Sequence, residues 1–276
     1  MKSAATAATR LASRRPGGFT VVELVVTAAI IAILSLVGFA GYSMVVNRAR
    51  MAAETAAARN LGTAYQLYAN DHNRELMPGY QEDPDATNLE GDPLYSPVNA
   101  RYPWRLAPYI GSLEGTLLYN GNQRFLDGDN RDYMVSVSPN MGINANFVGG
   151  HFGNSALVRP GSRMESRLGK FYVSRLGQAE NLIVFASARS DSGPGYFEVQ
   201  PPKAIGEVWS SQPFDPDAPA SKHGFVDFRW NGQAIVSMLD GSVAPKSEEQ
   251  LRDMRLWCQQ AAVEDDPDFT LGGGSR

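Results

Sequence analysis

One short segment near the start of the sequence has residue types and a spacing that could do chemistry. Gly17-Gly18-Phe19-Thr20-Val21-Val22-Glu23 places two glycines, an aromatic residue and a carboxylate at the start of an apolar run. A carboxylate in lipid is costly unless it has a partner. A cut after Gly18 would free an α-amino group on Phe19, which could pair with Glu23 of a second, packed copy. Glu23 would then set the register of an assembly.

The apolar run that follows predicts a membrane-spanning helix. Leu24 to Val46 is 23 residues without a charged side chain, which is about 35 Å of helix and enough to cross a hydrocarbon core. It is too long for the apolar region of a typical secretory signal, and no small-x-small cleavage site follows it. Four basic residues precede the run, and a smaller cluster of arginines follows it. This balance favours a cytoplasmic N-terminus.

These residues resemble the prepilin cleavage and methylation signal that type IV pilins share with type II secretion pseudopilins. The resemblance rests on Gly18-Phe19-Thr20-x-x-Glu23 followed by Leu24-Val25-Val26. It implies that a prepilin peptidase removes a leader peptide, residues 1–18, and that Phe19 is then N-methylated. It also implies assembly with other pilin-like subunits on a secretion or assembly platform in the bacterial inner membrane.

The helix is expected to continue beyond the membrane. Residues 51–68 are alanine-rich and lack proline, and Leu61, Tyr65 and Tyr68 share one helix face. One helix from Phe19 to about Asn73 would have a transmembrane half at 19–46 and an exposed amphipathic half at 47–76, ended by Pro78-Gly79. The segment from Leu67 to His72, leading to Pro78, also resembles the helix end of pseudopilins.

The remainder predicts a β-rich globular domain at 77–264 and a disordered tail at 265–276. We expect a short core helix near 102–110 and strands at 133–137, 171–173 and 182–188. Asn231-Gly232 predicts a type I′ hairpin between strands 225–230 and 233–239. Ser247 and Gln250 form a capping-box pattern before a helix at about 248–260. The predicted fold class is therefore α+β and pilin-like, with a long helix packed on a mainly antiparallel sheet.

Two further patterns stand out, one that suits calcium ligands and one that resembles a segment of a protein family. Asp127, Asp129 and Asp132 place three carboxylates within six residues, a spacing that suits calcium, although the EF-hand pattern fails at Arg131. His223-Gly224 with Asp240-Gly241 resembles the H-X9-DG segment of prepilin-associated proteins. Here 16 residues separate His223 from Asp240 instead of nine, which leaves the role of His223 open.

Composition and missing motifs narrow the function classes. Residues 19–276 carry 21 basic and 29 acidic side chains, a net charge of −8 that argues against nucleic-acid binding by the globular part. The chain has no Gly-x-Ser-x-Gly, His-Glu-x-x-His or phosphate-binding Gly-Lys loop, and its one cysteine, Cys258, reads as a core residue. We expect a structural protein that is not an enzyme and needs no cofactor.

Three functions stay open at this stage. The leading one is a subunit of a type II secretion pseudopilus, with a single membrane pass and a periplasmic globular domain. The second is a pilin of a type IV pilus used for adhesion or DNA uptake. The third is a membrane-tethered binding or enzymatic domain that uses the signal only for display.

Overall fold

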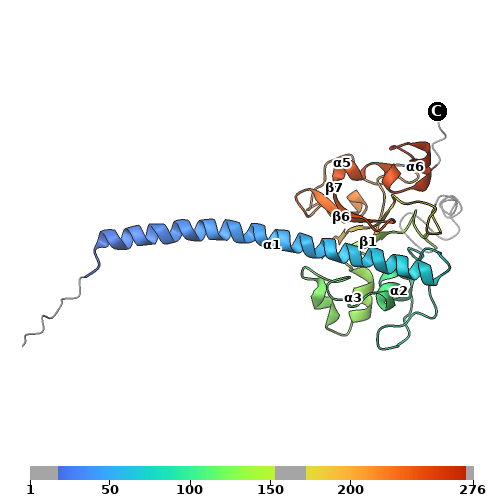
Figure 1. The fold of residues 1–276 in the computed structure, drawn as a ribbon, viewed down its shortest axis with the longest axis horizontal. Helices are drawn as coiled ribbons and strands as arrows, with labels where there is room; N and C mark the ends of the chain where they lie inside the picture. The colour runs from blue at the N-terminus through green and yellow to red at the C-terminus, as the bar shows by residue number, and fades with distance from the viewer. Residues whose placement is uncertain (1–17, 153–171, 272–276) are drawn as a thin grey trace, which may run out of the picture. The chain divides into compact units, whose positions relative to one another are not determined.

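The fold is α+β, as the sequence predicts. The computed structural model describes residues 18–152 and 172–271, which form a long helix and a mostly antiparallel mixed sheet (Figure 1). The chain divides into two compact units, Met1–Arg48 and Ala49–Arg276. The first helix contributes residues to both units.

Helix α1, Val21–Asp71, is continuous over 51 residues. It contains no proline and many alanines, which favour helix. It ends close to the expected Asn73, because Asn73 and Arg74 adopt left-handed backbone angles of φ 55° and 66°. Such a conformation commonly ends a helix. Across the part of the chain that the structure describes, no helix meets both the length and the hydropathy needed for a membrane span.

The main sheet has five strands in the order β5-β1-β2-β6-β7. Their bounds are β1 Met141–Asn144, β2 Ile183–Ser187, β5 Glu198–Val199, β6 Gln233–Met238 and β7 Val243–Ser247. All neighbours are antiparallel except β1 and β5. A separate two-stranded sheet joins β3 (Arg189–Ser190) to β4 (Gly193–Pro194). The strand expected at 182–188 is thus confirmed as β2.

Short helices surround this sheet. They are α2 Tyr102–Leu106, α3 Arg131–Val137, α5 Glu248–Leu251 and α6 Gln259–Glu264, with 3₁₀ turns η1 Val98–Ala100, η2 Ala107–Tyr109, η3 Asn122–Leu126, η4 Ala220–His223 and η5 Met254–Leu256. The expected short helix near 102–110 is confirmed. Its aromatic residues Tyr102 and Trp104 are buried, as core residues should be.

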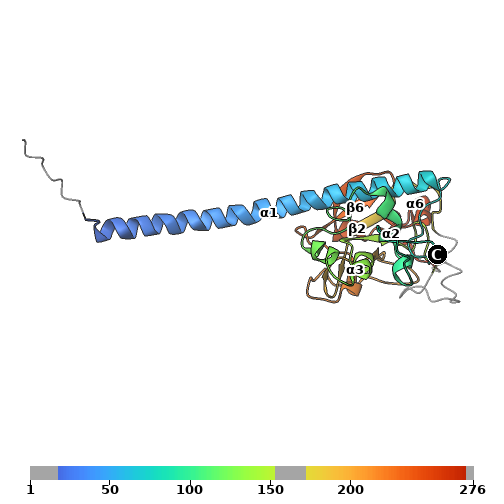
Figure 2. The ribbon, with the colours of Figure 1, turned by 90° about the horizontal axis from the view of Figure 1, so that it is seen from below.

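The sheet separates two apolar cores. One core contains Leu61 and Tyr65 of α1, together with Tyr102 and Phe185. The other lies between the sheet and the C-terminal helices and contains Trp257. Successive side chains of a strand point to opposite faces, so that Ile235 of β6 faces the first core while Ala234 and Val236 face the second. Figure 2 shows the C-terminal turns of α1 lying along β6 and β2.

The strand predicted at 133–137 is wrong, because this segment lies in helix α3. Its tyrosine and valines favour strands by composition. Asp132 lies in the first helical turn, where a negative charge is favourable. The indole of Trp104 donates to the Asp132 carbonyl at 2.9 Å, which ties this turn to α2. Of the strand expected at 171–173, residue 171 lies outside the described residues, and Val173 makes one isolated bridge to Val148.

The turn at Asn231-Gly232 is confirmed, but the strand predicted before it is not. Asn231 and Gly232 have φ of 52° and 78°, as a type I′ turn requires, and Trp230 and Gln233 exchange backbone hydrogen bonds of 3.1 Å. Both edges of β6 are already paired, with β2 and with β7. Residues 225–230 therefore have no free strand edge and form only isolated bridges, from Val226 to Ala188 and from Arg229 to Gln233.

The single helix predicted at about 248–260 is broken into α5, η5 and α6. The Ser247–Gln250 capping box is present. Asp253 then interrupts the helix, since its carboxylate accepts the backbone N–H of Arg255 at 2.9 Å and starts a new turn. Leu251, Met254 and Trp257 are nevertheless buried, as the predicted apolar stripe requires.

The C-terminal segment differs from the disordered tail expected for 265–276. Phe269 and Leu271 are buried, and the Leu271 N–H donates to the Ala204 carbonyl at 2.7 Å. Residues 265–271 therefore pack on the domain, because they carry two apolar side chains that the core accepts. Residues 272–276 lie outside the described residues.

Candidate functional site at the N-terminus of α1

The start of α1 is a capping box built from Thr20 and Glu23. The Thr20 backbone N–H and hydroxyl donate to Glu23 Oε2 at 2.9 and 2.8 Å, and the Glu23 N–H donates back to the Thr20 hydroxyl at 3.3 Å. This reciprocal pattern satisfies backbone donors that a helix N-terminus otherwise leaves unpaired. The spacing Thr-x-x-Glu was visible in the sequence, where we interpreted Glu23 only as a partner for another chain.

The capping box leaves part of the Glu23 carboxylate available. Both bonds from Thr20 end on Oε2, and Oε1 accepts no hydrogen bond from the described residues. Glu23 is exposed, so a donor from another molecule could reach it. The geometry therefore suits a carboxylate that is held in place within its own chain and still open to an external amine.

Gly18 and Phe19 are not required by the packing of the described chain. A side-chain carbon added to Gly18 would meet nothing within 4 Å. Phe19 is 80% exposed. Folding thus gives no reason for a glycine at position 18 or an aromatic residue at position 19, and recognition by another protein would.

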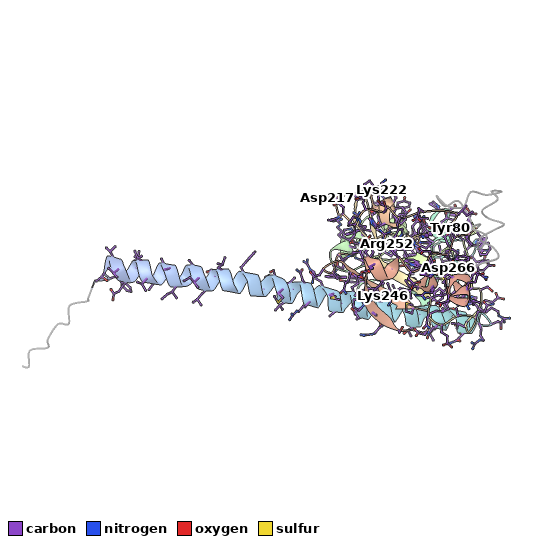
Figure 3. All side chains as sticks on the ribbon, turned by 90° about the horizontal axis from the view of Figure 1, so that it is seen from above. Tyr80, Asp217, Lys222, Lys246, Arg252 and Asp266 are labelled. Carbon is purple, nitrogen blue, oxygen red and sulfur yellow. The ribbon has the colours of Figure 1, made fainter. Side chains whose placement is uncertain are left out.

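An exposed apolar surface follows the capping box along the first unit. Large apolar side chains from Val21 to Val45 are exposed, and they stand away from the helix in Figure 3. The segment carries no charge between Glu23 and Arg48. An apolar surface of this extent marks contact with a membrane or with other protein chains.

The three aspartates of the calcium hypothesis are not brought together as a ligand set. Asp132 accepts hydrogen bonds from the Asn88 amide at 2.9 Å and from Arg131 Nε at 3.0 Å. Arg131 in turn binds Glu90 through both of its terminal nitrogens. Within residues 18–152 and 172–271, no group of three His, Cys, Asp or Glu side chains could hold a metal ion. Calcium binding by Asp127, Asp129 and Asp132 remains a prediction without geometric support.

His223 is buried in an aromatic environment next to an acid. It is 2% exposed, lies against the rings of Trp209 and Phe214, and places Nε2 3.3 Å from Glu248 Oε1. Burial alone would raise the pKa of Glu248, but hydrogen bonds from the Phe214 N–H and from Arg252 hold that pKa below its usual range.

The other half of the H-X9-DG resemblance has different contacts. Asp240 lies in the turn between β6 and β7, where its carboxylate accepts the Ser242 N–H at 2.8 Å and its N–H donates to the Glu180 carbonyl at 3.0 Å. The contacts that the structure describes for His223 and for Asp240 are therefore separate, with Glu248 and with Ser242 and Glu180 respectively. Cys258 is fully buried and burial raises its pKa, which agrees with its interpretation as a core residue.

Replacing Thr20 with valine should loosen the first turn of α1. The variant loses the hydroxyl that donates to and accepts from Glu23, and loss of such a cap costs about 1 kcal/mol. We expect amide hydrogen exchange in residues 20–24 of the uncut chain in detergent to accelerate roughly fivefold. Thr20→Ser keeps the hydroxyl and is the matched control. Equal protection in all three proteins would show that the capping box does not hold the turn.

Comparison with known proteins identifies the same segment. Residues 13–39 match the family model of the prokaryotic N-terminal methylation motif, which is consistent with a type IV pilin-like signal. No curated protein and no solved structure matches the chain. The match ends at residue 39, so it covers the site at Gly18, Phe19 and Glu23 and not the globular unit.

Proposed function

We propose that this chain is a pilin-like structural subunit, not an enzyme, that assembles through α1 into a type II secretion pseudopilus. The methylation motif at residues 13–39 carries this proposal, because that signal belongs to subunits of pilin-like filaments. Processing would begin with a prepilin peptidase that cuts after Gly18. Methylation of Phe19 and insertion of the helix into a filament would follow.

The membrane topology is part of the proposal. The uncharged segment from Leu24 to Val46 and its exposed apolar side chains support a helix that lies in the inner membrane before assembly. The basic residues of the leader favour a cytoplasmic N-terminus, so the unit from Ala49 onward would lie in the periplasm.

Assembly would bury the apolar surface of the first unit against neighbouring stems. Heterologous contacts that do not close on themselves produce an open filament. Glu23 would accept a hydrogen bond from the methylated amine of Phe19 in the next subunit. Its Oε1 is suited to that hydrogen bond, because Thr20 donates to Oε2. The charged pair would be neutral only when two subunits have the correct register.

Glu23→Ala tests this proposal. We expect cleavage after Gly18 to continue while the amount of the protein in sheared filaments falls at least tenfold, because an unpaired amine in the apolar stem is costly. Intact mass of the membrane-extracted protein measures cleavage, and immunoblotting of the filament fraction measures assembly. Glu82→Ala, an exposed acid of the globular unit, is the control.

Either of two results would contradict the proposal. Normal incorporation of the Glu23→Ala protein would refute the pairing with Phe19. A ligand-binding or catalytic activity that survives Glu23→Ala unchanged would instead favour the tethered-domain function. Loss of protein secretion in a deletion strain supports the pseudopilus, whereas loss of adhesion or DNA uptake alone supports a pilus pilin.

A further inference from the structure

Glu54 is a fully buried acid on an otherwise alanine-rich stretch of α1. It is the only acidic residue between Glu23 and Asp71, and its exposed fraction is 0%. A carboxylate removed from water is strongly unfavourable unless other groups pair with it. The surroundings of Glu54 must therefore supply its partners.

Those partners come from two distant parts of the chain. The hydroxyl of Ser187, at the end of β2, donates to Glu54 Oε1 and accepts the Ile235 N–H of β6 at 2.8 Å. Arg229 places Nη1 3.6 Å from Glu54 Oε2. The acid on the helix is thus held by a strand and by the segment that leads into β6.

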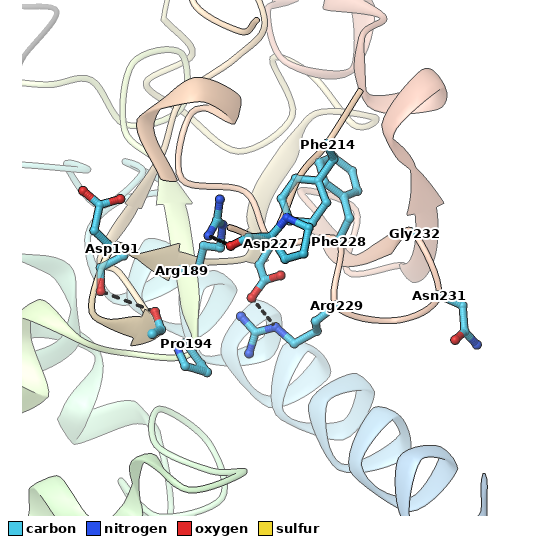
Figure 4. A pocket seen from close by; sticks show the side chains of 12 residues that line it. Arg189, Asp191, Pro194, Phe214, Asp227, Phe228, Arg229, Asn231 and Gly232 are labelled. Atoms are coloured by element: carbon cyan, nitrogen blue, oxygen red, sulfur yellow. Dashed lines mark hydrogen bonds and ion pairs between the residues drawn. The ribbon is translucent and has the colours of Figure 1, made fainter. Parts of the chain in front are cut away.

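Arg229 is itself held in place by further groups. Its Nε lies 2.9 Å from Asp227 Oδ2, as Figure 4 shows, and it donates to the Ala188 carbonyl. Burial alone would lower the pKa of Arg229, but the charges of Glu54 and Asp227 raise it, so the guanidinium stays protonated. Arg229 and Asp227 also line a surface cavity of about 660 Å³.

Glu54 belongs to one face of α1 that contacts the sheet at three levels. Residues 54, 58, 62 and 66 recur every four positions and so share a helix face. A side-chain carbon on Gly62 would lie 2.6 Å from the Ser237 hydroxyl of β6. Gln66 donates to the Leu239 carbonyl at 3.1 Å. The face therefore combines one charge, two small residues and one amide.

Such a face specifies register through its polar contacts. Ala58 and Gly62 have little or no side chain to interlock with the sheet, and neighbouring turns of an alanine-rich helix have similar surfaces. Apolar packing alone therefore resists sliding of α1 along the sheet only weakly. A slip by one turn would move α1 by about 5.4 Å. It would bring either Ala58 or the cation Arg50 opposite Arg229, and it would move Glu54 away from its partners. Both slipped arrangements leave a buried charge unpaired.

We propose that Glu54 and Arg229 form a register pin that fixes the axial position and rotation of α1 on the β-sheet. This proposal deepens the proposed filament function, since the pin determines how each globular unit is presented once its helix is packed. Buried ion pairs are poor sources of net stability, and apolar replacements of both partners are often as stable. Their best-documented use is to select one register among similar alternatives.

The experiment measures register directly in the full chain in detergent. Glu54→Leu, Arg229→Met and the double variant are combined with cysteine pairs. Gln66→Cys with Gly241→Cys, joined by a short thiol crosslinker, reports the native register, because Nε2 at the end of the Gln66 side chain lies 3.2 Å from the position of a Gly241 Cβ. Asn70→Cys or Thr63→Cys, both at exposed positions about one turn from Gln66, with Gly241→Cys reports a slip by one turn in either direction.

We expect each single variant to lower the urea midpoint and the double variant to restore it. In the double variant, the native crosslink should fall at least threefold and a slipped crosslink should appear. A double variant that keeps only the native crosslink overturns the proposal. If the double variant does not fold, Glu54→Gln, which retains the bond to Ser187, decides the matter: slipped product supports the pin and native product alone overturns it.

This readout is independent of filament formation. A failure of the pin leaves the Glu23→Ala result untouched, and a failure of filament assembly leaves the crosslinking result untouched. When both proposals hold, the stable double variant should also enter filaments at less than one third of the wild-type amount. Normal entry of a register-mixed variant would overturn the role of the pin in presentation.

Discussion

Replacing Gly18 with valine should leave the chain uncut, with residues 1–18 still attached. A side chain at position 18 meets nothing within 4 Å, so the substitution leaves the described structure undisturbed. Under the proposed function, the effect arises in the active site of the prepilin peptidase, where a branched side chain next to the bond to be cut is bulky. We expect processing to fall by at least a hundredfold, and intact mass with N-terminal sequencing measures it.

The matched control is Gly38→Val, which makes the same chemical change where a side chain also meets nothing within 4 Å. This variant should be cut normally, because position 38 lies far from the bond after Gly18. Mature Gly18→Val protein that begins at Phe19 would refute the processing assignment. Loss of cutting in both variants would point to impaired membrane insertion instead.

Replacing Gly149 with alanine should give the largest loss of stability in the globular unit. Gly149 has φ of +74°, and a side-chain carbon there would lie 1.9 Å from the Met77 carbonyl oxygen. Left-handed backbone costs an alanine about 1–2 kcal/mol, and overpacking adds about 1–3 kcal/mol. We expect the free energy of unfolding of the full chain in detergent to fall by about 3 kcal/mol, measured by urea denaturation.

Gly115→Ala separates these two contributions. Gly115 has a similar φ of +78°, but a side-chain carbon there meets nothing within 4 Å. This variant should lose only the backbone part, about 1–2 kcal/mol. Equal losses of unfolding free energy in both variants would mean that the segment around Gly149 moves to relieve the contact with Met77. The packing between these two segments would then tolerate a small displacement.

The features predicted well are those whose cause lies within a few neighbouring residues. The capping pattern at Ser247 and the turn at Asn231-Gly232 depend on side chains that bond to their own backbone or tolerate positive φ. Helix α1 depends on a long stretch that lacks proline and is rich in alanine. These causes are local, so the sequence displays them directly.

The features predicted poorly depend on partners that are distant in sequence. Residues 225–230 look like a strand, but β2 and β7 already occupy both edges of β6. Asp132 was a candidate calcium ligand beside the alternative of a solvated turn, and the sequence did not indicate its hydrogen bond with Asn88, which is 44 residues away. In each case the competing contact comes from a segment whose proximity only the folded chain creates.

Glu54 shows the same limit most clearly. A single acid on an alanine-rich helix is typical of a solvated surface, and no local pattern distinguishes it. Its burial depends on Ser187 and Arg229, which lie 133 and 175 positions further along the sequence.

The sequence by itself therefore determined the N-terminal methylation motif, the long helix and the α+β class. Each of these follows from contiguous residues and their periodicity. The tertiary structure alone decided which strand edges are filled, that the aspartates of 127–132 do not converge, and that Glu54 is enclosed with Arg229. The physical reason is that burial and ion pairing depend on distance in space, and packing sets that distance after local conformation has been chosen.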